Sequence, residues 1–224
     1  KAQADSTIDN GATHREIRIL AKAYHRLGNQ QFRDAAVAGV KYLLQAQYDN
    51  GGWPQRYPQP SSYHQHITYN DDAMIGVMNL FRNIVQGSGD LEFISSEIRR
   101  QCDRALQRGL QCILKTQIRV DGRLTAWCAQ HDVKTLAPAK ARSYELPSIS
   151  GNESVGIVRY LMKIEDPDND VVAAIEGAIS WFERVQLKGL RQVKVEAPAA
   201  PNGMDIKVIP DPSAPPLWAR FYDL

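Results

Sequence analysis

Apolar residues recur every three or four positions along most of the chain, which is the spacing of an amphipathic helix. The first such pattern carries Ile17, Leu20, Tyr24 and Leu27, and it ends at Gly28, a residue typical of helix C-termini. Five further patterns follow. The sequence therefore predicts an all-α chain, with helices over residues 10–27, 33–48, 72–85, 97–118, 153–164 and 171–185.

The second, fourth and sixth patterns share a motif. Gly39, Gly109 and Gly177 are each followed by large apolar residues four and five positions later, and they recur about every 70 residues. Because glycine costs a helix about 1 kcal/mol relative to alanine, its recurrence indicates close packing between helices. The repeat predicts three helical hairpins around an axis, as a short solenoid or a closed α/α toroid, and an ordinary helical bundle is the alternative.

Composition excludes several classes of protein. With 43% hydrophobic residues in 224 positions, the chain has enough apolar side chains for a sizeable core, and we expect one domain over residues 1–224. The 27 basic and 25 acidic side chains leave a net charge of +2, which gives no reason to expect a nucleic acid partner. No window approaches about 18 uninterrupted apolar residues, so no membrane span is expected. Three cysteines are too few for a disulfide scaffold.

The character of the sequence changes after Lys188. Six of the twelve prolines lie beyond it, so residues 190–217 are predicted to form a proline-rich loop segment. Within this segment, residues 193–195 and 206–208 alternate weakly and are expected to pair as a short β-hairpin. The chain begins without Met and stops abruptly at Leu224, and we expect it to lack N-terminal and C-terminal residues of a longer protein.

Polar segments containing Asn or Asp precede the first, third and fifth helices. Asp9 and Asn10 precede the first, and Asp71 and Asp72 precede the third. N-capping of the free amides at a helix start would account for one such residue per helix. If the three hairpins ring an axis, however, these helix starts converge at one end. Converging carboxylate and amide oxygens suit Ca²⁺, which takes about six to eight oxygen ligands.

A second polar cluster lies between the fourth and fifth helices. Lys140 and Arg142 in this segment are candidates for binding an anionic group, although loop cations usually form surface salt bridges. The aromatic residues Trp53 and Tyr69 lie before the third helix, close to its acidic start. Aromatic rings beside carboxylates are common in carbohydrate grooves, and packing beneath a loop is equally common.

Histidine and cysteine residues raise the alternative of a zinc site. His64 with His66, and Cys128 with His131, would supply four ligands. Each of these residues has an ordinary core or loop explanation, and a nucleophilic Cys128–His131 pair lacks the sequence context of a catalytic elbow. We therefore favour the oxygen-ligand site.

Six segments, in the same order along the chain, resemble a known family. They are STIDNGAT (6–13), NGGWPQ (50–55), HITYNDDAM (66–74), WCAQHD (127–132), ARSYELPS (141–148) and WARFYDL (218–224). The chain resembles the family 10 pectate lyases, secreted enzymes that cleave polygalacturonate. The resemblance implies an irregular (α/α)3 toroid and Ca²⁺-dependent β-elimination, which gives 4,5-unsaturated oligogalacturonides.

Carried over position by position, the resemblance assigns the Brønsted base to Arg142 and calcium binding to Asp71. The acidic residue of the family's first loop falls on Asp9, which is expected to be catalytic and to bind the metal. Asn10, beside it, and Arg220, in the last matching segment, are expected to bind substrate. The family's pattern continues beyond Leu224 with further substrate-binding arginines.

Three further residues are substrate-binding candidates on weaker grounds. Lys140 has no secure counterpart in the family, and we place it as a contact for a substrate carboxylate. Trp53 and Tyr69 are included as aromatic residues beside the acidic segment. The expected enzyme is a monomeric catalytic module that acts on pectate outside the cell or in the periplasm.

Two other functions remain open at this point. An α/α-toroid glycoside hydrolase would use paired carboxylates, such as Asp71 and Glu145. A non-catalytic helical repeat would bind a partner through its concave face and would need neither calcium nor turnover. The combination of Asp9, Asp71 and Arg142 argues against a scaffold, which has no use for such a cluster.

Overall fold

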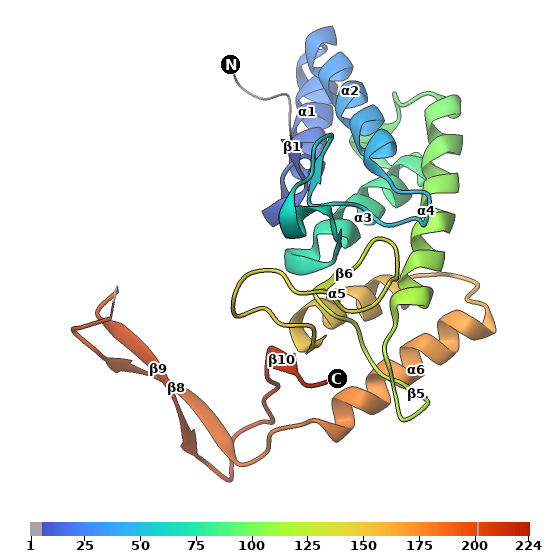
Figure 1. Cartoon of the computed structure of the whole chain (residues 1–224). Coiled ribbons are helices and arrows are strands. Elements are labelled where there is room, and N and C mark those ends of the chain that lie inside the picture. The colour runs from blue at the N-terminus through green and yellow to red at the C-terminus, as the bar shows by residue number, and fades with distance from the viewer. Residues whose placement is uncertain (1–5, 201) are drawn as a thin grey trace.

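The computed structural model describes residues 6–200 and 202–224. Within these residues, helices pair along the chain as three hairpins, α1 with α2, α3 with α4 and α5 with α6 (Figure 1). Their bounds are α1 (His14–Leu27), α2 (Gln30–Ala46), α3 (Ala73–Gln86), α4 (Ser96–Thr116), α5 (Gly151–Leu161) and α6 (Asn169–Arg184). None of these helices combines the length and the apolar composition needed to cross a bilayer.

Short antiparallel strand pairs join the loops between helices. Four of these pairs have strands of two residues; three of the four join segments that are distant in sequence, and β4 with β5 forms a local hairpin. The pairs are β1 (Ser6–Thr7) with β2 (Arg56–Tyr57), β3 (Ile67–Thr68) with β6 (Gln130–His131), β4 (Arg119–Val120) with β5 (Arg123–Leu124), β7 (Ile149–Ser150) with β10 (Phe221–Tyr222), and β8 (Leu190–Glu196) with β9 (Met204–Pro210).

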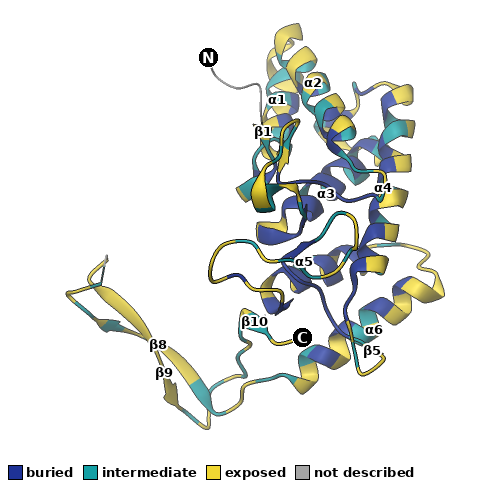
Figure 2. Cartoon of the chain, in the orientation of Figure 1, coloured by how far each residue is buried: buried dark blue, intermediate teal, exposed yellow. Residues whose placement is uncertain are grey.

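The helices form two layers around the centre. The inner helices α1, α3 and α5 contact one another in succession, and so do the outer helices α2, α4 and α6. Eight residues of α3 are buried, because this helix packs between α1 and α5 and against α4 (Figure 2). A helix surrounded in this way is apolar on most of its surface. The arrangement confirms the predicted (α/α)3 toroid of three helical hairpins.

The repeated glycines lie at close contacts, as predicted. A Cβ atom on Gly39 would come within 2.6 Å of the Ile17 side chain on α1, and one on Gly109 within 2.9 Å of Met78 on α3. The third glycine differs in its partner. A Cβ on Gly177 would lie 2.6 Å from Leu124 on β5 rather than against a helix.

The repeat extends to two glutamines that directly follow the outer helices. The side-chain amide of Gln47 donates to the carbonyl oxygen of Ala105 on α4 at 2.9 Å, and that of Gln117 donates to Ala174 on α6 at 2.8 Å. Each amide also donates to one loop carbonyl. Each outer helix is therefore attached to the next one by the same polar contact.

The proline-rich segment contains a longer hairpin than the sequence predicts. Strands β8 and β9 pair over seven residues each, from Leu190–Pro210 to Glu196–Met204. The hairpin extends away from the helices, and most of its side chains are exposed (Figure 2). Pro201, between the two strands in sequence, lies outside the described residues.

Candidate active site

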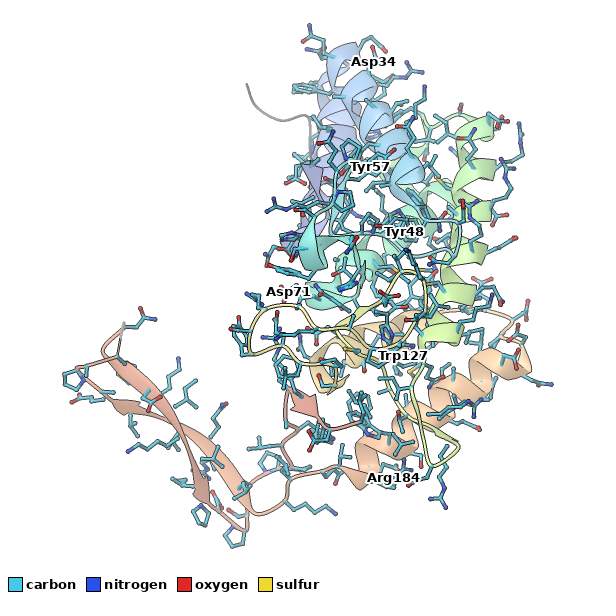
Figure 3. The ribbon with its side chains drawn as sticks, in the orientation of Figure 1. Asp34, Tyr48, Tyr57, Asp71, Trp127 and Arg184 are labelled. Atoms are coloured by element: carbon cyan, nitrogen blue, oxygen red, sulfur yellow. The ribbon has the colours of Figure 1, made fainter. Side chains whose placement is uncertain are left out.

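The starts of the inner helices converge, as predicted from the repeat. Two single 3-10 turns, η1 (Asp9–Gly11) and η3 (Asn70–Asp72), precede α1 and α3 and contact each other. The turn η3 also contacts α5. Figure 3 shows Asp71 at the N-terminal end of α3. Carboxylates from two polar segments, 62 positions apart in the sequence (71 minus 9), therefore lie at one end of the helical layers.

The polar residues at these inner helix starts do not act as caps. The outer helices α2, α4 and α6 are capped by the side chains of Asn29, Ser95 and Asp168, which accept hydrogen bonds from backbone amides. By contrast, the residues preceding α1, α3 and α5 make no capping bond with their side chains among the described residues. Capping therefore explains the outer helices and leaves the acidic residues of η1 and η3 available for a ligand.

Backbone strain gathers at the same place. Asn10 and Asp71 adopt φ values of 49° and 51° in the middle of their turns, and Asp72 follows with 57°. Positive φ is uncommon for residues other than glycine, and Asn and Asp tolerate it best. Such conformations persist only where the surroundings enforce them, and they cluster at ligand-binding and catalytic sites. The strain also explains why α1 begins at His14 and not at Asn10.

The two acidic turns provide donors for a cation. The Oδ1 atom of Asp9 is buried without a hydrogen-bond partner among the described residues, which is costly for a carboxylate oxygen. The Oδ2 atom of Asp71 accepts a 2.7 Å hydrogen bond from the Asn70 side chain. The described residues contain no group of three acidic, histidine or cysteine side chains suited to a metal. The donors fit a Ca²⁺ ion that takes its other ligands from water and an acidic substrate.

The electrostatics of the turn agree with a site for positive charge. The pKa of the Asp72 carboxyl is raised by its partial burial and by the neighbouring charges of Glu153 and Asp71. The negative charges of Asp71 and Glu153 therefore disfavour the charged form of Asp72.

Arg142 is held by Glu145 three residues later. Its Nε and Nη2 atoms donate to the two oxygens of Glu145 at 2.7 and 2.5 Å, and its backbone amide donates to the same carboxylate at 3.2 Å. Glu145 is buried, whereas the Arg142 side chain is 45% exposed. The hydrogen bonds raise the pKa of Arg142 above its usual value and lower that of Glu145. The guanidinium is therefore protonated in this arrangement.

Arg220 lies between the acidic turns and the loop that carries Arg142, which we call the arginine loop (residues 140–145). Its charge contributes to the lowered pKa of Glu145, and its Nη2 atom donates to the side-chain oxygen of Asn70 at 3.4 Å. Arg220 is therefore near enough to the Arg142–Glu145 pair to affect it electrostatically, while its side chain contacts the turn of Asp71. Lys140, on the loop that carries Arg142, is exposed.

A cavity of about 700 Å³ opens beside these groups. Asp71, Asn152 and Arg220 line its polar part, and Phe182 and Trp218 line its apolar part. The sequence pattern did not single out Phe182 or Asn152 as lining residues. Trp218 belongs to one of the matching segments, which was the available signal for its position.

Trp53 and Tyr69 lie in the core and not in a groove. Both are fully buried. The Trp53 indole donates to the Leu43 carbonyl oxygen at 2.8 Å, and the Tyr69 hydroxyl lies 2.7 Å from that of Thr116. With no exposed surface, neither ring has access to a polymer, and both are assigned to packing.

Two of the four residues of the zinc alternative, Cys128 and His131, serve the structure of a loop. The Nε2 atom of His131 accepts a hydrogen bond from the backbone amide of Cys128 at 3.1 Å, and its Nδ1 atom donates to the Leu136 carbonyl oxygen at 2.9 Å. The Cys128 thiol lies 3.9 Å from the carbonyl oxygen of Ala139. Both ring nitrogens of His131 are thus occupied, and the thiol is not directed at the imidazole.

Comparisons with known proteins agree on one family. A family model described as pectic acid lyase matches residues 1–224. The family 10 polysaccharide lyase from Cellvibrio cellulosa superimposes with a TM-score of 0.87 and 34% sequence identity, over 98% of this chain and 67% of that one. A mutant of that lyase in complex with trigalacturonic acid superimposes with a TM-score of 0.87 and 33% sequence identity, over the same shares of the two chains. No curated protein matches the sequence.

Proposed function

Because this chain belongs to the pectic acid lyase family and is a polysaccharide lyase, we propose that it cleaves polygalacturonate by calcium-dependent β-elimination. A similar lyase has been crystallised with trigalacturonic acid, which supports a polyuronate as the substrate. The products would be oligogalacturonides with a 4,5-unsaturated residue at the new non-reducing end.

One observation carries the calcium assignment. The Oδ1 atom of Asp9 is buried and has no hydrogen-bond partner in the described part of the chain, and its turn contacts the turn of Asp71. In the proposed enzyme, Asp9 and Asp71 hold Ca²⁺. When bound, the ion neutralises the uronate carboxylate and so makes the adjacent C5 proton more acidic. Asp9 thus contributes to catalysis as a metal ligand.

The proton transfer is proposed for Arg142. In the elimination, the proton on C5 passes to a base while the C4–O bond breaks, and the oxygen of the leaving sugar takes up a proton from solvent. Arginine is an unusual base because its guanidinium is normally protonated. In this protein deprotonation of Arg142 costs more free energy than usual, since Glu145 raises its pKa. Arg142 must therefore lose its own proton to solvent and leave the ion pair before it can accept the C5 proton, and alkaline pH favours this neutral state.

Substrate binding is proposed for exposed groups around the cavity. Arg220 is 44% exposed and lines the cavity beside Asp71, so its guanidinium is accessible to a uronate carboxylate. Asn10 is exposed next to Asp9, and Lys140 is exposed on the arginine loop. We propose that these two contact neighbouring sugars of the polymer.

The observations argue against both alternative functions, a glycoside hydrolase and a binding scaffold. A hydrolase acid must be protonated at working pH, which requires a raised pKa. Glu145 has a lowered pKa because Arg142 donates two hydrogen bonds to it. Glu145 is therefore unsuited to be the general acid of a glycoside hydrolase. A binding scaffold is excluded because the family is enzymatic.

The substrate also bears on where the enzyme works. A pectate polymer is too large to enter a cell, so we propose secretion to the extracellular space or the periplasm. All groups of the proposed site come from a single chain, and a monomer is therefore sufficient for activity.

Product chemistry tests this proposal. Polygalacturonate is incubated with the protein and Ca²⁺ at alkaline pH, and the products are followed by ultraviolet absorbance and mass spectrometry. Elimination forms a conjugated double bond without taking up water, so absorbance rises and product masses sum to that of the substrate. If each cleavage instead adds the mass of one water molecule to the products and absorbance does not rise, the reaction is hydrolysis and the lyase proposal is refuted.

A further inference from the structure

Glu153, on the first turn of α5, is a buried carboxylate that the proposed mechanism does not use. Its side chain is 0% exposed. A buried carboxylate is stable only when it is paired and hydrogen-bonded. Here the Ser150 hydroxyl and the Asn152 side-chain amide donate to it, and Arg220 Nη2 lies 3.5 Å from its Oε1 atom.

Arg220 reaches Glu153 because the last strand is attached to the start of α5. Strand β10 pairs with β7, which places Phe221 opposite Ser150. The carbonyl oxygen of Arg220 accepts a 2.9 Å hydrogen bond from the Gly151 amide. The backbone of Arg220 and the carboxylate of Glu153 are thus fixed on the same turn, and the guanidinium extends from there toward the cavity.

From Arg220 the contacts continue to the acidic turn. Its Nη2 atom donates to the Asn70 side-chain oxygen at 3.4 Å, and the Asn70 side-chain nitrogen donates to Asp71 Oδ2 at 2.7 Å. Arginine has only donors, so the Asn70 oxygen must face it, and the amide nitrogen must then face Asp71. Among the described residues, the second oxygen of Asp71 makes no hydrogen bond and remains available to a ligand.

We propose that Glu153 is a positioning residue: it holds Arg220 against Asn70 and thereby fixes the orientation of the Asp71 carboxylate. The inference rests on the proposed function, because the role of Asp71 as a calcium ligand comes from there. A merely structural Glu153 would stabilise the β7–β10 pair and leave Asp71 unaffected. The two roles therefore differ in what happens at Asp71 when Glu153 loses its charge.

Crystal structures of the wild type, Glu153→Gln and Arg220→Gln test the positioning directly. In both variants we expect the Asn70 side chain to leave Asp71. The guanidinium of Arg220, which orients the Asn70 oxygen, is released in Glu153→Gln and absent in Arg220→Gln. Arg220 is half-exposed, so its variant is expected to fold even if Glu153→Gln does not. An Asn70–Asp71 hydrogen bond unchanged in the variants would overturn the proposal, whatever the activity of the protein.

The calcium concentration that gives half-maximal cleavage of polygalacturonate provides the second readout. We expect it to rise about fivefold in Glu153→Gln, the effect of one lost hydrogen bond. Ser154→Ala is the matched control, since this buried hydroxyl on the same helix contacts the Trp127 backbone and not Arg220. An equal rise in the control would overturn the positioning role. A wild-type protein without lyase activity would instead refute the proposed function.

A double-mutant cycle separates positioning from the loss of one negative charge. If Glu153 acts through Arg220, Glu153→Gln has no further effect on the calcium requirement once Arg220 is glutamine. If Glu153 attracts the cation directly, the effect persists in that background. Full additivity of the two substitutions would therefore overturn the proposal.

Discussion

The ion pair between Arg142 and Glu145 makes the proposed base testable through a single substitution. In Glu145→Gln, the side chain keeps its size and its buried position but loses the charge that holds the guanidinium protonated. Glu145 raises the pKa of Arg142, so removing its charge lowers that pKa. If neutral Arg142 is the base, a larger fraction of the enzyme is then active at any given alkaline pH.

The size of the effect follows from the geometry of the pair. A hydrogen bond to a charged group contributes about 1.5–3 kcal/mol, and a pKa unit corresponds to about 1.4 kcal/mol. Because the Arg142 side chain is 45% exposed, solvent screens the pair and the lower end applies. We expect the limb of the pH–rate profile on which the rate rises with pH to move to lower pH by about one unit.

The assay is the initial rate of unsaturated product formation from polygalacturonate across the alkaline range. Glu97→Gln is the control, because Glu97 also pairs with an arginine three residues later but lies exposed on α4. Its profile should match the wild type. A Glu145→Gln profile that is unchanged, or that moves to higher pH, would refute the assignment of Arg142 as the base.

Three predictions concern stability. Burial lowers the pKa of His131 to about 4 from 6.5, so the unfolded chain binds more protons than the folded chain between these pH values. The free energy of unfolding should therefore fall by about 2–3 kcal/mol as the pH drops from 6.5 to 4. Denaturant titrations that give the same free energy at both pH values would contradict this prediction. Gln117→Ala should cost about 2–3 kcal/mol, since two backbone carbonyl oxygens lose a buried donor, whereas exposed Gln107→Ala should cost under about 0.5. Gly51→Ala should lower the free energy of unfolding by more than about 2 kcal/mol, because φ of Gly51 is 92° and a Cβ atom would lie 2.0 Å from a backbone oxygen of α4. The control Gly122→Ala should cost only about 1 kcal/mol, since Gly122 has a φ of 75° but no atom near its Cβ position. Equal losses in the two variants would refute the steric argument.

Periodicity predicted the helices well because it reflects which side chains are buried. Five of the six helix starts lie within three residues of the expected positions, among them α3 at Ala73 and α6 at Asn169. The repeat of glycines predicted the hairpin architecture for the same reason, since close packing selects them. The α1 start was wrong by four residues, because positive φ at Asn10 and Thr13 is a tertiary effect that local pattern does not encode.

The candidate site was predicted in part. Convergence of Asp9 and Asp71 followed from the repeat, once three equivalent hairpins had been recognised. The prediction that aromatic residues bind substrate failed, because an exposed groove residue and a buried core residue look alike in sequence. Trp53 and Tyr69 both proved to be buried.

Contacts between distant segments were beyond prediction. Nothing in the local sequence indicates that Glu153 would meet Arg220, since the pairing of β7 with β10 brings them together from 67 positions apart (220 minus 153). The Arg142–Glu145 pair is local, yet its spacing suits a helical salt bridge as well as a loop. Only the structure shows the bidentate contact and its effect on the pKa of Arg142.

The calcium dependence of unsaturated product release tests the central claim most directly. Activity on polygalacturonate should vanish with EDTA and return when Ca²⁺ is added in excess. In Asp71→Asn, the calcium titration should move to higher concentration, whereas Asp34→Asn, an exposed site on α2, should follow the wild type. Product release that is indifferent to EDTA, or an Asp71→Asn titration identical to the wild type, would contradict calcium-dependent elimination at this site.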